Sequence, residues 1–214
     1  MTKNKQVFII GAGGHGRVAY EIIKLNGYQV LGFINDNIEL KGQKIDSIPV
    51  LGDFAWLLDN INDEKVFIAI GDNERRAEYF YRLLEHGLEL INAVHPTAIL
   101  SPTAEIQGRN ILLAMGSIIG TKAVIKDNVI INTGAILDHE VLIEKHVHIS
   151  PGVKIAGRCN VGEFTHVGIG ATLIQDIDVG RNCIIGAGAV VLKNVPDGWL
   201  AAGVPAALKK ELKA

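Results

Sequence analysis

The residues best suited to chemistry in this sequence are histidines that stand beside acidic residues. His139 has Asp138 before it and Glu140 after it, and two further histidines follow at His146 and His148. A carboxylate that accepts a hydrogen bond from one ring nitrogen fixes the tautomer and makes the other nitrogen a better base. The pattern therefore indicates a general base at His139; the alternative is a surface histidine with acidic neighbours by chance.

Three histidines so close together could also bind zinc, which takes imidazole ligands. We expect the three rings to point from different corners of the fold, and no cysteine lies on their side. We therefore predict that the protein holds no metal, and we place His146 on the surface.

A second candidate site lies in a glycine-rich segment near the start of the chain. Gly11-Ala-Gly-Gly-His-Gly16 follows the apolar residues 7–10 and precedes a helical pattern over residues 17–26. A strand, a glycine turn and a helix offer backbone N–H groups to phosphates at the helix N-terminus. We predict that this edge binds a nucleotide through Gly13, Gly14, His15, Asn35, Asp36 and Gly71.

Strands and helices alternate around this segment and predict a small parallel sheet. Further strands are expected over residues 29–34, 66–70 and 88–94, and helices over residues 54–59 and 75–86, the first of them capped by Asp53. A complete dinucleotide-binding fold needs six strands and roughly 150 residues. Only about 90 precede the next pattern, so a half-sized Rossmann-like module fits better than a nicotinamide enzyme.

The second half of the chain repeats every six residues. From Leu113 to Val191 an aliphatic residue takes the first place of every hexad, and a small or β-branched residue takes the fifth. Helices repeat near 3.6 residues and strands near 2. A period of six indicates a solenoid of short strands, with the first residue inward and the fifth in a corner. Cys159 and Cys183 take fifth places, which predicts buried thiols and no disulfide.

The hexads with Val-Gly and Ile-Gly pairs, at 161–162, 167–168, 179–180 and 185–186, resemble those of the hexapeptide-repeat acyltransferases. The resemblance implies a left-handed parallel β-helix with three hexads in each coil. The expected fold is an α/β Rossmann-like half-domain with a parallel sheet over residues 1–93, the β-helix over residues 94–206, and a polar tail over residues 207–214. One extra residue before Leu113 predicts a bulge.

The glycine loop together with Asp138-His139-Glu140 resembles the nucleotide-aminosugar N-acetyltransferases of bacterial surface-glycan synthesis and the related sialic acid O-acetyltransferases. This resemblance implies an acetyl-CoA-dependent enzyme with His139, supported by Glu140, as general base. It implies that His148 lies at the thioester end of acetyl-CoA and His15 near a pyrophosphate, and that the protein is a homotrimer with its site between adjacent β-helices. The implied coenzyme contacts are Ile169 and Ala187.

The repeat itself places one more residue beside His139. Residues one coil apart stack at about 4.8 Å, the spacing of strands. Gly157 follows His139 by one coil, so it leaves room for the thioester oxygen near its backbone N–H. The reaction that the resemblance implies is direct acetylation of the 4-amino group of a UDP-linked sugar, with a GDP-linked sugar as the less favoured acceptor.

Composition narrows the remaining classes of function and partner. The chain has 214 residues, is 48% hydrophobic, and carries a net charge of -2, which argues against a nucleic-acid partner. We expect a cytoplasmic protein, because we find no signal peptide and no apolar run long enough to span a membrane. Two alternatives stay open: acetylation of a sugar hydroxyl by the same groups, and a non-enzymatic nucleotide-sugar-binding or scaffold protein.

Overall fold

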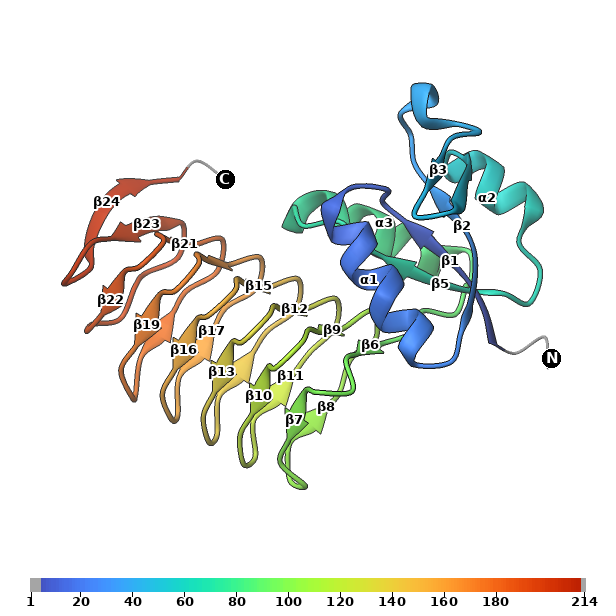
Figure 1. Ribbon diagram of the computed structural model, residues 1–214. Coiled ribbons are helices and arrows are strands. Elements are labelled where there is room, and N and C mark those ends of the chain that lie inside the picture. The colour runs from blue at the N-terminus through green and yellow to red at the C-terminus, as the bar shows by residue number, and fades with distance from the viewer. Residues whose placement is uncertain (1–4, 213–214) are drawn as a thin grey trace. The chain divides into compact units, whose positions relative to one another are not determined.

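The alternating strands and helices at the start of the chain form a five-stranded sheet (Figure 1). The computed structural model describes residues 5–212, and its contacts divide the chain into two units, Met1–Pro96 and Thr97–Ala214. The sheet of unit 1 has the order β3-β4-β2-β1-β5, parallel except for the β3–β4 hairpin. Its strands are β1 (Gln6–Ile10), β2 (Gln29–Ile34), β3 (Lys44–Ile45), β4 (Ile48–Gly52) and β5 (Lys65–Ile68).

The helices of unit 1 begin where the sequence supplies caps or glycines. They are α1 (Gly14–Leu25), α2 (Phe54–Asn60) and α3 (Asn73–Glu85), with a short 3-10 turn, η2, at Ile38–Leu40. Asp53 accepts a hydrogen bond from the N–H of Trp56 and so caps α2, as predicted. The strand predicted over residues 88–94 is wrong in extent, because only a single bridge at Leu90 and the two residues of β6 (Ala93–Val94) form there.

The hexads form a parallel β-helix of two-residue strands in unit 2. Face 1 holds β7 (Ile99–Leu100), β10 (Ile118–Ile119), β13 (Ile136–Leu137), β16 (Lys154–Ile155), β19 (Thr172–Leu173) and β22 (Val190–Val191). Face 2 holds β8 (Glu105–Ile106), β11 (Val124–Ile125), β14 (Leu142–Ile143), β17 (Asn160–Val161) and β20 (Asp178–Val179). Face 3 includes β9 (Leu112–Leu113), β12 (Ile130–Ile131), β15 (His148–Ile149), β18 (His166–Val167) and β21 (Ile184–Ile185).

The register confirms the repeat. Ile118 pairs with Ile136, and Ile130 pairs with His148, each eighteen residues on. Ile118 also pairs with Ile99, nineteen residues back, so the extra residue falls before β9, where the bulge was predicted. The first and fifth places from Leu113 to Val195 are at most 4% exposed, so they form the core of the β-helix.

The end of the chain departs from the predicted tail. β23 (Trp199–Ala202) continues face 3 beside β21, and β24 (Ala207–Glu211) pairs with β23 in the antiparallel sense. All five residues of β24 are exposed, which explains why a polar composition suggested a tail. Residues 213 and 214 of that predicted tail lie outside the described part of the chain.

Three corners join the faces, and each repeats one backbone conformation. Corner 1 joins face 1 to face 2 and contains His139; corner 2 joins face 2 to face 3 and contains His146; corner 3 joins face 3 to face 1 and contains Ile169. Non-glycine residues adopt a left-handed φ of 53° to 62° at corners 1 and 2, for example 59° at Glu140. Glycines such as Gly170 take this conformation at corner 3.

Candidate active site

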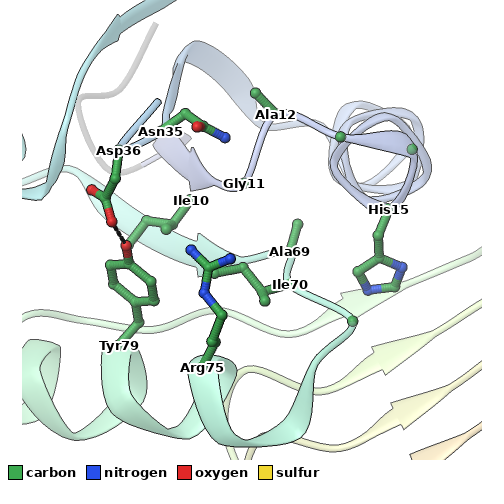
Figure 2. A pocket seen from close by; sticks show the side chains of 13 residues that line it. Ile10, Gly11, Ala12, His15, Asn35, Asp36, Ala69, Ile70, Arg75 and Tyr79 are labelled. Carbon is green, nitrogen blue, oxygen red and sulfur yellow. Dashed lines mark hydrogen bonds between the residues drawn. The ribbon is translucent and has the colours of Figure 1, made fainter. Parts of the chain in front are cut away.

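A pocket opens at the carboxyl ends of β1, β2 and β5, where parallel sheets commonly bind ligands. Its volume is about 260 Å³. It is lined by Ile10, Gly11, Ala12, Gly13, Gly14, His15, Asn35, Asp36, Ala69, Ile70, Gly71, Arg75 and Tyr79 (Figure 2). The structure therefore brings together all six residues that the sequence predicted as nucleotide contacts.

The glycines of this pocket serve two purposes. A side chain at Gly16 would come within 2.1 Å of the carbonyl oxygen of Gly11, so this position must stay bare for α1 to pack against the turn. Gly13 and Gly14 instead face open space, with no atom within 4 Å of an added Cβ. Since α1 begins at Gly14 and Gly13 supplies no side-chain cap, the helix N-terminus meets the pocket as bare backbone.

His15 and the Asp36–Tyr79 pair lie at opposite ends of the pocket (Figure 2). Burial, and then the charge of Arg76, lower the pKa of His15 to about 4. The ring is therefore neutral near pH 7 and can serve a ligand through hydrogen bonding, without a charge of its own. His15 therefore does not offer a bound anion a permanent positive charge, although an anion next to the ring would favour its protonation.

At the other end, the hydroxyl of Tyr79 donates to Oδ2 of Asp36. Burial, and then this carboxylate, raise the pKa of Tyr79 to about 12, so the phenol keeps its proton. The N–H of Phe54 donates to the other oxygen of Asp36 at 3.4 Å, and Asn35 accepts from the N–H of Asn37 at 2.9 Å. Asp36 is thus a fixed, negatively charged wall of the pocket.

Two arginines of α3 belong to this site although the sequence did not predict them as site residues. Arg75 lines the pocket beside Ile70 (Figure 2), and supplies the positive charge that the predicted residues lacked. Arg76 is fully buried and donates to the carbonyls of Ile70 and Gly71 at 3.0 and 3.1 Å, which fixes the turn that carries Gly71. Burial is the main cause that lowers the pKa of Arg76 to about 9. The sequence signal for α3 was its N-cap, Asp72. The signal for Arg75 was its spacing of four residues from Tyr79, which puts both side chains on one helix face.

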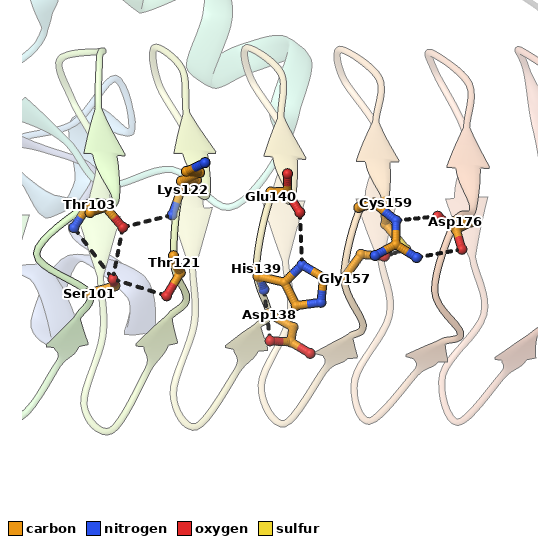
Figure 3. Close-up of polar contacts among 11 residues, drawn as sticks. Ser101, Thr103, Thr121, Lys122, Asp138, His139, Glu140, Gly157, Cys159 and Asp176 are labelled. Carbon is orange, nitrogen blue, oxygen red and sulfur yellow. Dashed lines mark hydrogen bonds and ion pairs between the residues drawn. The ribbon is translucent and has the colours of Figure 1, made fainter.

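His139 stands outward at corner 1, as its place in the hexad predicted. Its Nδ1 lies 3.1 Å from Oε2 of Glu140, and its backbone N–H donates to Asp138 at 2.7 Å (Figure 3). The side chains of His139 and Glu140 are 42% and 51% exposed. Because Glu140 accepts at Nδ1, the ring presents Nε2 as its basic nitrogen.

The same ring lies directly over Gly157. A Cβ added to Gly157 would lie 2.3 Å from both Cε1 and Nε2 of His139. Gly157 itself is buried, and the two residues follow one another by one coil at corner 1. Any side chain at this position would occupy the space of the imidazole, so the glycine is what permits this ring position.

The other predicted coenzyme residues lie elsewhere in the chain. His148 is on face 3, where its ring centroid lies 4.7 Å from that of His166 with the ring planes tilted by 47°, and His166 Nε2 lies 3.0 Å from the hydroxyl of Ser150. Ile169 and Ala187 are exposed at corner 3. One chain thus brings His139, Glu140 and Gly157 together at corner 1, whereas Ile169 and Ala187 lie across face 1 at corner 3 and His148 lies on face 3, which does not adjoin corner 1.

The expectation of a surface position for His146 is wrong, because its ring is fully buried. It stacks on Phe164 at 4.7 Å, and Asn128 donates to its Nδ1 at 2.8 Å. Asn110 donates in turn to Asn128 at 2.7 Å. The left-handed turn directs each of these side chains along corner 2, and asparagines one coil back were the signal that the sequence offered.

Within residues 5–212, no three side chains of His, Cys, Asp or Glu are grouped to hold a metal ion. None of the helices in that part of the chain has the length and apolar character to cross a membrane. Cys159 and Cys183 are free and buried.

Known proteins resemble the chain over nearly its whole length. The family model of the PglD N-terminal domain matches residues 6–83. A perosamine N-acetyltransferase mutant from Caulobacter crescentus, in complex with CoA and GDP-perosamine, is 34% identical over 96% of this chain and 97% of that chain, with a TM-score of 0.90. The acetyltransferase domain of PglB from Neisseria gonorrhoeae FA1090 is 34% identical over 96% of this chain and all of that chain, with a TM-score of 0.89.

Two further matches extend this result. WeeI from Acinetobacter baumannii AYE, 22% identical over 95% of this chain, shares the fold with a TM-score of 0.86. The uncharacterized protein L142 of Acanthamoeba polyphaga mimivirus is 31% identical over 119 residues, and the match spans 22% of that protein's length.

A pocket lies after β1, and the His139 turn lies on a β-helix of hexads. Both features agree with the structures of a perosamine N-acetyltransferase and of an acetyltransferase domain. The β-helix is the left-handed one that the resemblance implied. The chain belongs to the hexapeptide-repeat acyltransferases, in the family of nucleotide-aminosugar N-acetyltransferases.

Proposed function

We propose that this protein transfers the acetyl group of acetyl-CoA to the 4-amino group of a sugar linked to a nucleoside diphosphate. The observation that carries the proposal is the His139 ring, which is fixed by Glu140 and lies over a bare backbone at Gly157. The Caulobacter relative was crystallised with CoA and GDP-perosamine, and the Neisseria domain with acetyl coenzyme A. We assign nucleotide-sugar binding to residues 1–93 and acetyl transfer to residues 94–206.

The reaction needs one base and one stabilised oxyanion. The sugar amine attacks the thioester carbonyl while Nε2 of His139 takes the proton from the amine nitrogen. The Gly157 backbone N–H is the proposed donor to the oxyanion. The intermediate then collapses, the C–S bond breaks, and the proton on His139 passes to the CoA sulfur, which yields the amide and free CoA.

No covalent acyl-enzyme is required. Cys159 is the thiol nearest in sequence to Gly157, but its Sγ lies 3.0 Å from the carbonyl of Ile174 inside the coil. Burial raises the pKa of this thiol, so the thiolate that would attack a thioester is disfavoured. Direct transfer is therefore the proposed route.

The proposed assembly is a homotrimer. His148, Ile169 and Ala187 are separated from His139 within one chain, yet the resemblance assigns all of them to one coenzyme. A second copy that presents face 3 and corner 3 to corner 1 would unite them, and a closed ring of copies satisfies every such interface. The cytoplasm stays the predicted compartment.

In the pocket, the α1 N-terminus and His15 are proposed to hold the diphosphate, with Asn35, Asp36 and Gly71 toward the nucleoside. The prediction of UDP over GDP stays open to test, since the Caulobacter relative binds a GDP-sugar. A thiol-release assay with acetyl-CoA should compare UDP- and GDP-linked 4-amino sugars with matched hydroxyl sugars. Turnover of an amino sugar supports the proposal, and turnover of hydroxyl sugars alone would make the protein an O-acetyltransferase.

The non-enzymatic alternative makes a separate prediction. A nucleotide-sugar-binding or scaffold protein would retain the pocket of unit 1 without a use for acetyl-CoA. Calorimetry with acetyl-CoA separates the two cases, because the proposed enzyme binds it and a scaffold does not.

A further inference from the structure

The residue that holds His139, Glu140, belongs to a column of charged residues along corner 1. Lys122, Glu140, Arg158 and Asp176 follow one another at intervals of eighteen residues and alternate in charge. All four have a left-handed φ between 55° and 62°, so each occupies the same place in its turn. Coils stack at about 4.8 Å, and Glu140 therefore has a cation one coil away on either side.

Arg158 is committed to the carboxylate on its far side. Its Nε and Nη2 donate to the two oxygens of Asp176 at 2.7 and 2.9 Å, a bidentate pair. This pairing is the first cause that raises the pKa of Arg158, with Glu140 a smaller one, and it lowers the pKa of Asp176. Figure 3 shows Asp176 beyond Gly157 as seen from His139.

The backbone ties these three turns together. The N–H of Arg158 donates to the carbonyl of His139 at 2.9 Å, and the N–H of Asp176 donates to the carbonyl of Gly157 at 3.1 Å. The backbone of Arg158 is thus fixed one coil from Glu140, and its guanidinium is turned toward Asp176. Both side chains are about half exposed, so the pair contributes little to stability, and its main consequence is where the guanidinium points.

Three donors neighbour Glu140: the Nδ1–H of His139 in its own turn, and the guanidinium of Arg158 and the ammonium of Lys122 in the adjacent coils. Arginine binds carboxylates with two parallel hydrogen bonds, whereas imidazole offers one, so a released Arg158 would compete effectively for Glu140. We propose that Asp176 is a positioning residue of the acetyltransferase site, which keeps Arg158 occupied and so leaves the Glu140 carboxylate to His139. The proposal rests on the proposed role of His139.

The charged groups that face the ring are few. Asp138 and Glu140 belong to its own turn, Lys122 to the preceding coil, and Arg158 and Asp176 to the following coils. Among them, Arg158 is the cation whose backbone N–H is bonded to His139 itself. Asp176→Asn keeps the shape of the side chain and removes the charge that holds this cation.

The test is a double-variant cycle on pH profiles. Asp176→Asn should lower kcat by about 10-fold or more, because the base loses its orienting carboxylate. The acid limb of kcat/KM should also move to lower pH, since imidazolium is less stable without that carboxylate. The double variant Asp176→Asn/Arg158→Ala should recover most of the lost kcat, and its acid limb should return to the wild-type pH. The reason is that no guanidinium remains to compete with His139 for Glu140.

The chain offers a matched control in Arg181 and Asp197. This pair lies at corner 2 with similar exposure, and Nη2 and Oδ2 are 3.2 Å apart. Asp197→Asn should leave the acid limb in place. A wild-type profile in Asp176→Asn, or a double variant as impaired as the single one, would overturn the proposal.

A readout without substrates separates this inference from the proposed function. The His139 ring can be titrated by NMR in the whole protein, with His139→Gln to assign its signals. Its midpoint should fall in Asp176→Asn and return in the double variant. If wild-type protein shows no acetyl transfer, the proposed function fails while this titration still decides the role of Asp176; an unmoved midpoint rejects that role even in an active enzyme.

Discussion

The imidazole of His139 occupies space that any side chain at Gly157 would need. The contact is with the far end of the His139 side chain, and the backbone of Gly157 does not have a left-handed φ. A methyl group here is therefore compatible with the backbone and incompatible with the ring position. This distinction allows the geometry of the base to be tested separately from the stability of the coil.

Gly157→Ala should lower kcat by about 10²-fold, because a displacement near 1 Å of a catalytic group has effects of that size. The melting temperature should change little, since the ring can swing toward solvent. Steady-state kinetics and thermal unfolding on the same preparation check both statements. Unchanged kcat with a folded protein would contradict the proposed place of the imidazole.

A second prediction at this scale concerns His15. Its pKa in the folded protein is about 4, below its ordinary value of 6.5, so the unfolded chain binds the proton more readily between these limits. The stability of unit 1 should therefore be unaffected above pH 7 and fall as the pH drops through 6.5 toward 4. The expected loss between pH 7.5 and 5 is about 2 kcal/mol.

Urea unfolding followed by Trp56 fluorescence, with Trp199→Phe to remove the other tryptophan, measures this loss in unit 1. His15→Asn should reduce the pH dependence by that amount. If the variant keeps the full pH dependence, His15 is not its source.

Among the elements, corner 2 shows how the β-helix uses side chains in its turns. Asn110, Asn128 and His146 form a continuous line of hydrogen bonds, and Phe164 closes the line by stacking on the imidazole. The same left-handed conformation recurs at Asn182. Asparagine tolerates this conformation well, which explains its recurrence at the corner.

His146→Ala should therefore destabilise unit 2 by about 1–3 kcal/mol, since Asn128 loses a buried partner. His146→Asn should be closer to wild type, because it suits the left-handed turn and can continue the line. Urea unfolding followed by Trp199 fluorescence, in a Trp56→Phe background, compares the two. Equal losses would show that the line of amides contributes nothing specific.

The elements that the sequence predicted well are those with a strong period. Fourteen hexads predicted the short strands of unit 2, and the resemblance to the hexapeptide-repeat acyltransferases supplied three hexads per coil and the handedness. The extra residue before Leu113 predicted the irregularity in the first coil. The end of unit 1 was harder to predict. The apolar residues 88–94 have the composition of a strand, but most of them have no neighbouring strand to pair with. Local pattern cannot show whether a neighbouring strand exists.

At the scale of the whole molecule, one chain holds the parts of the proposed coenzyme site in separate places, at corner 1, at corner 3 and on face 3. Sequence spacing correctly put His139 outward and beside Gly157, since both facts follow from the repeat. The sequence signals named above did not decide whether His146 turns inward, or whether the helix face with Arg75 and Tyr79 meets the pocket of unit 1. Those facts depend on side-chain direction and on contacts between distant elements.

A mixing experiment tests whether copies share a site. His139→Ala and His148→Ala chains should each be impaired alone, and a refolded equal mixture should recover about a quarter of wild-type turnover. A site is intact only where the first chain keeps His139 and its neighbour keeps His148, each with a chance of one half. No recovery from the mixture would place both histidines in a site within one chain.

The most direct test of the whole account is the turnover of His139→Ala with acetyl-CoA and the best amino sugar from the acceptor panel. The account predicts a loss of about 10²–10⁴-fold in kcat, the effect of removing a general base, with calorimetric binding of acetyl-CoA retained. A variant that binds acetyl-CoA and turns over near the wild-type rate would contradict it.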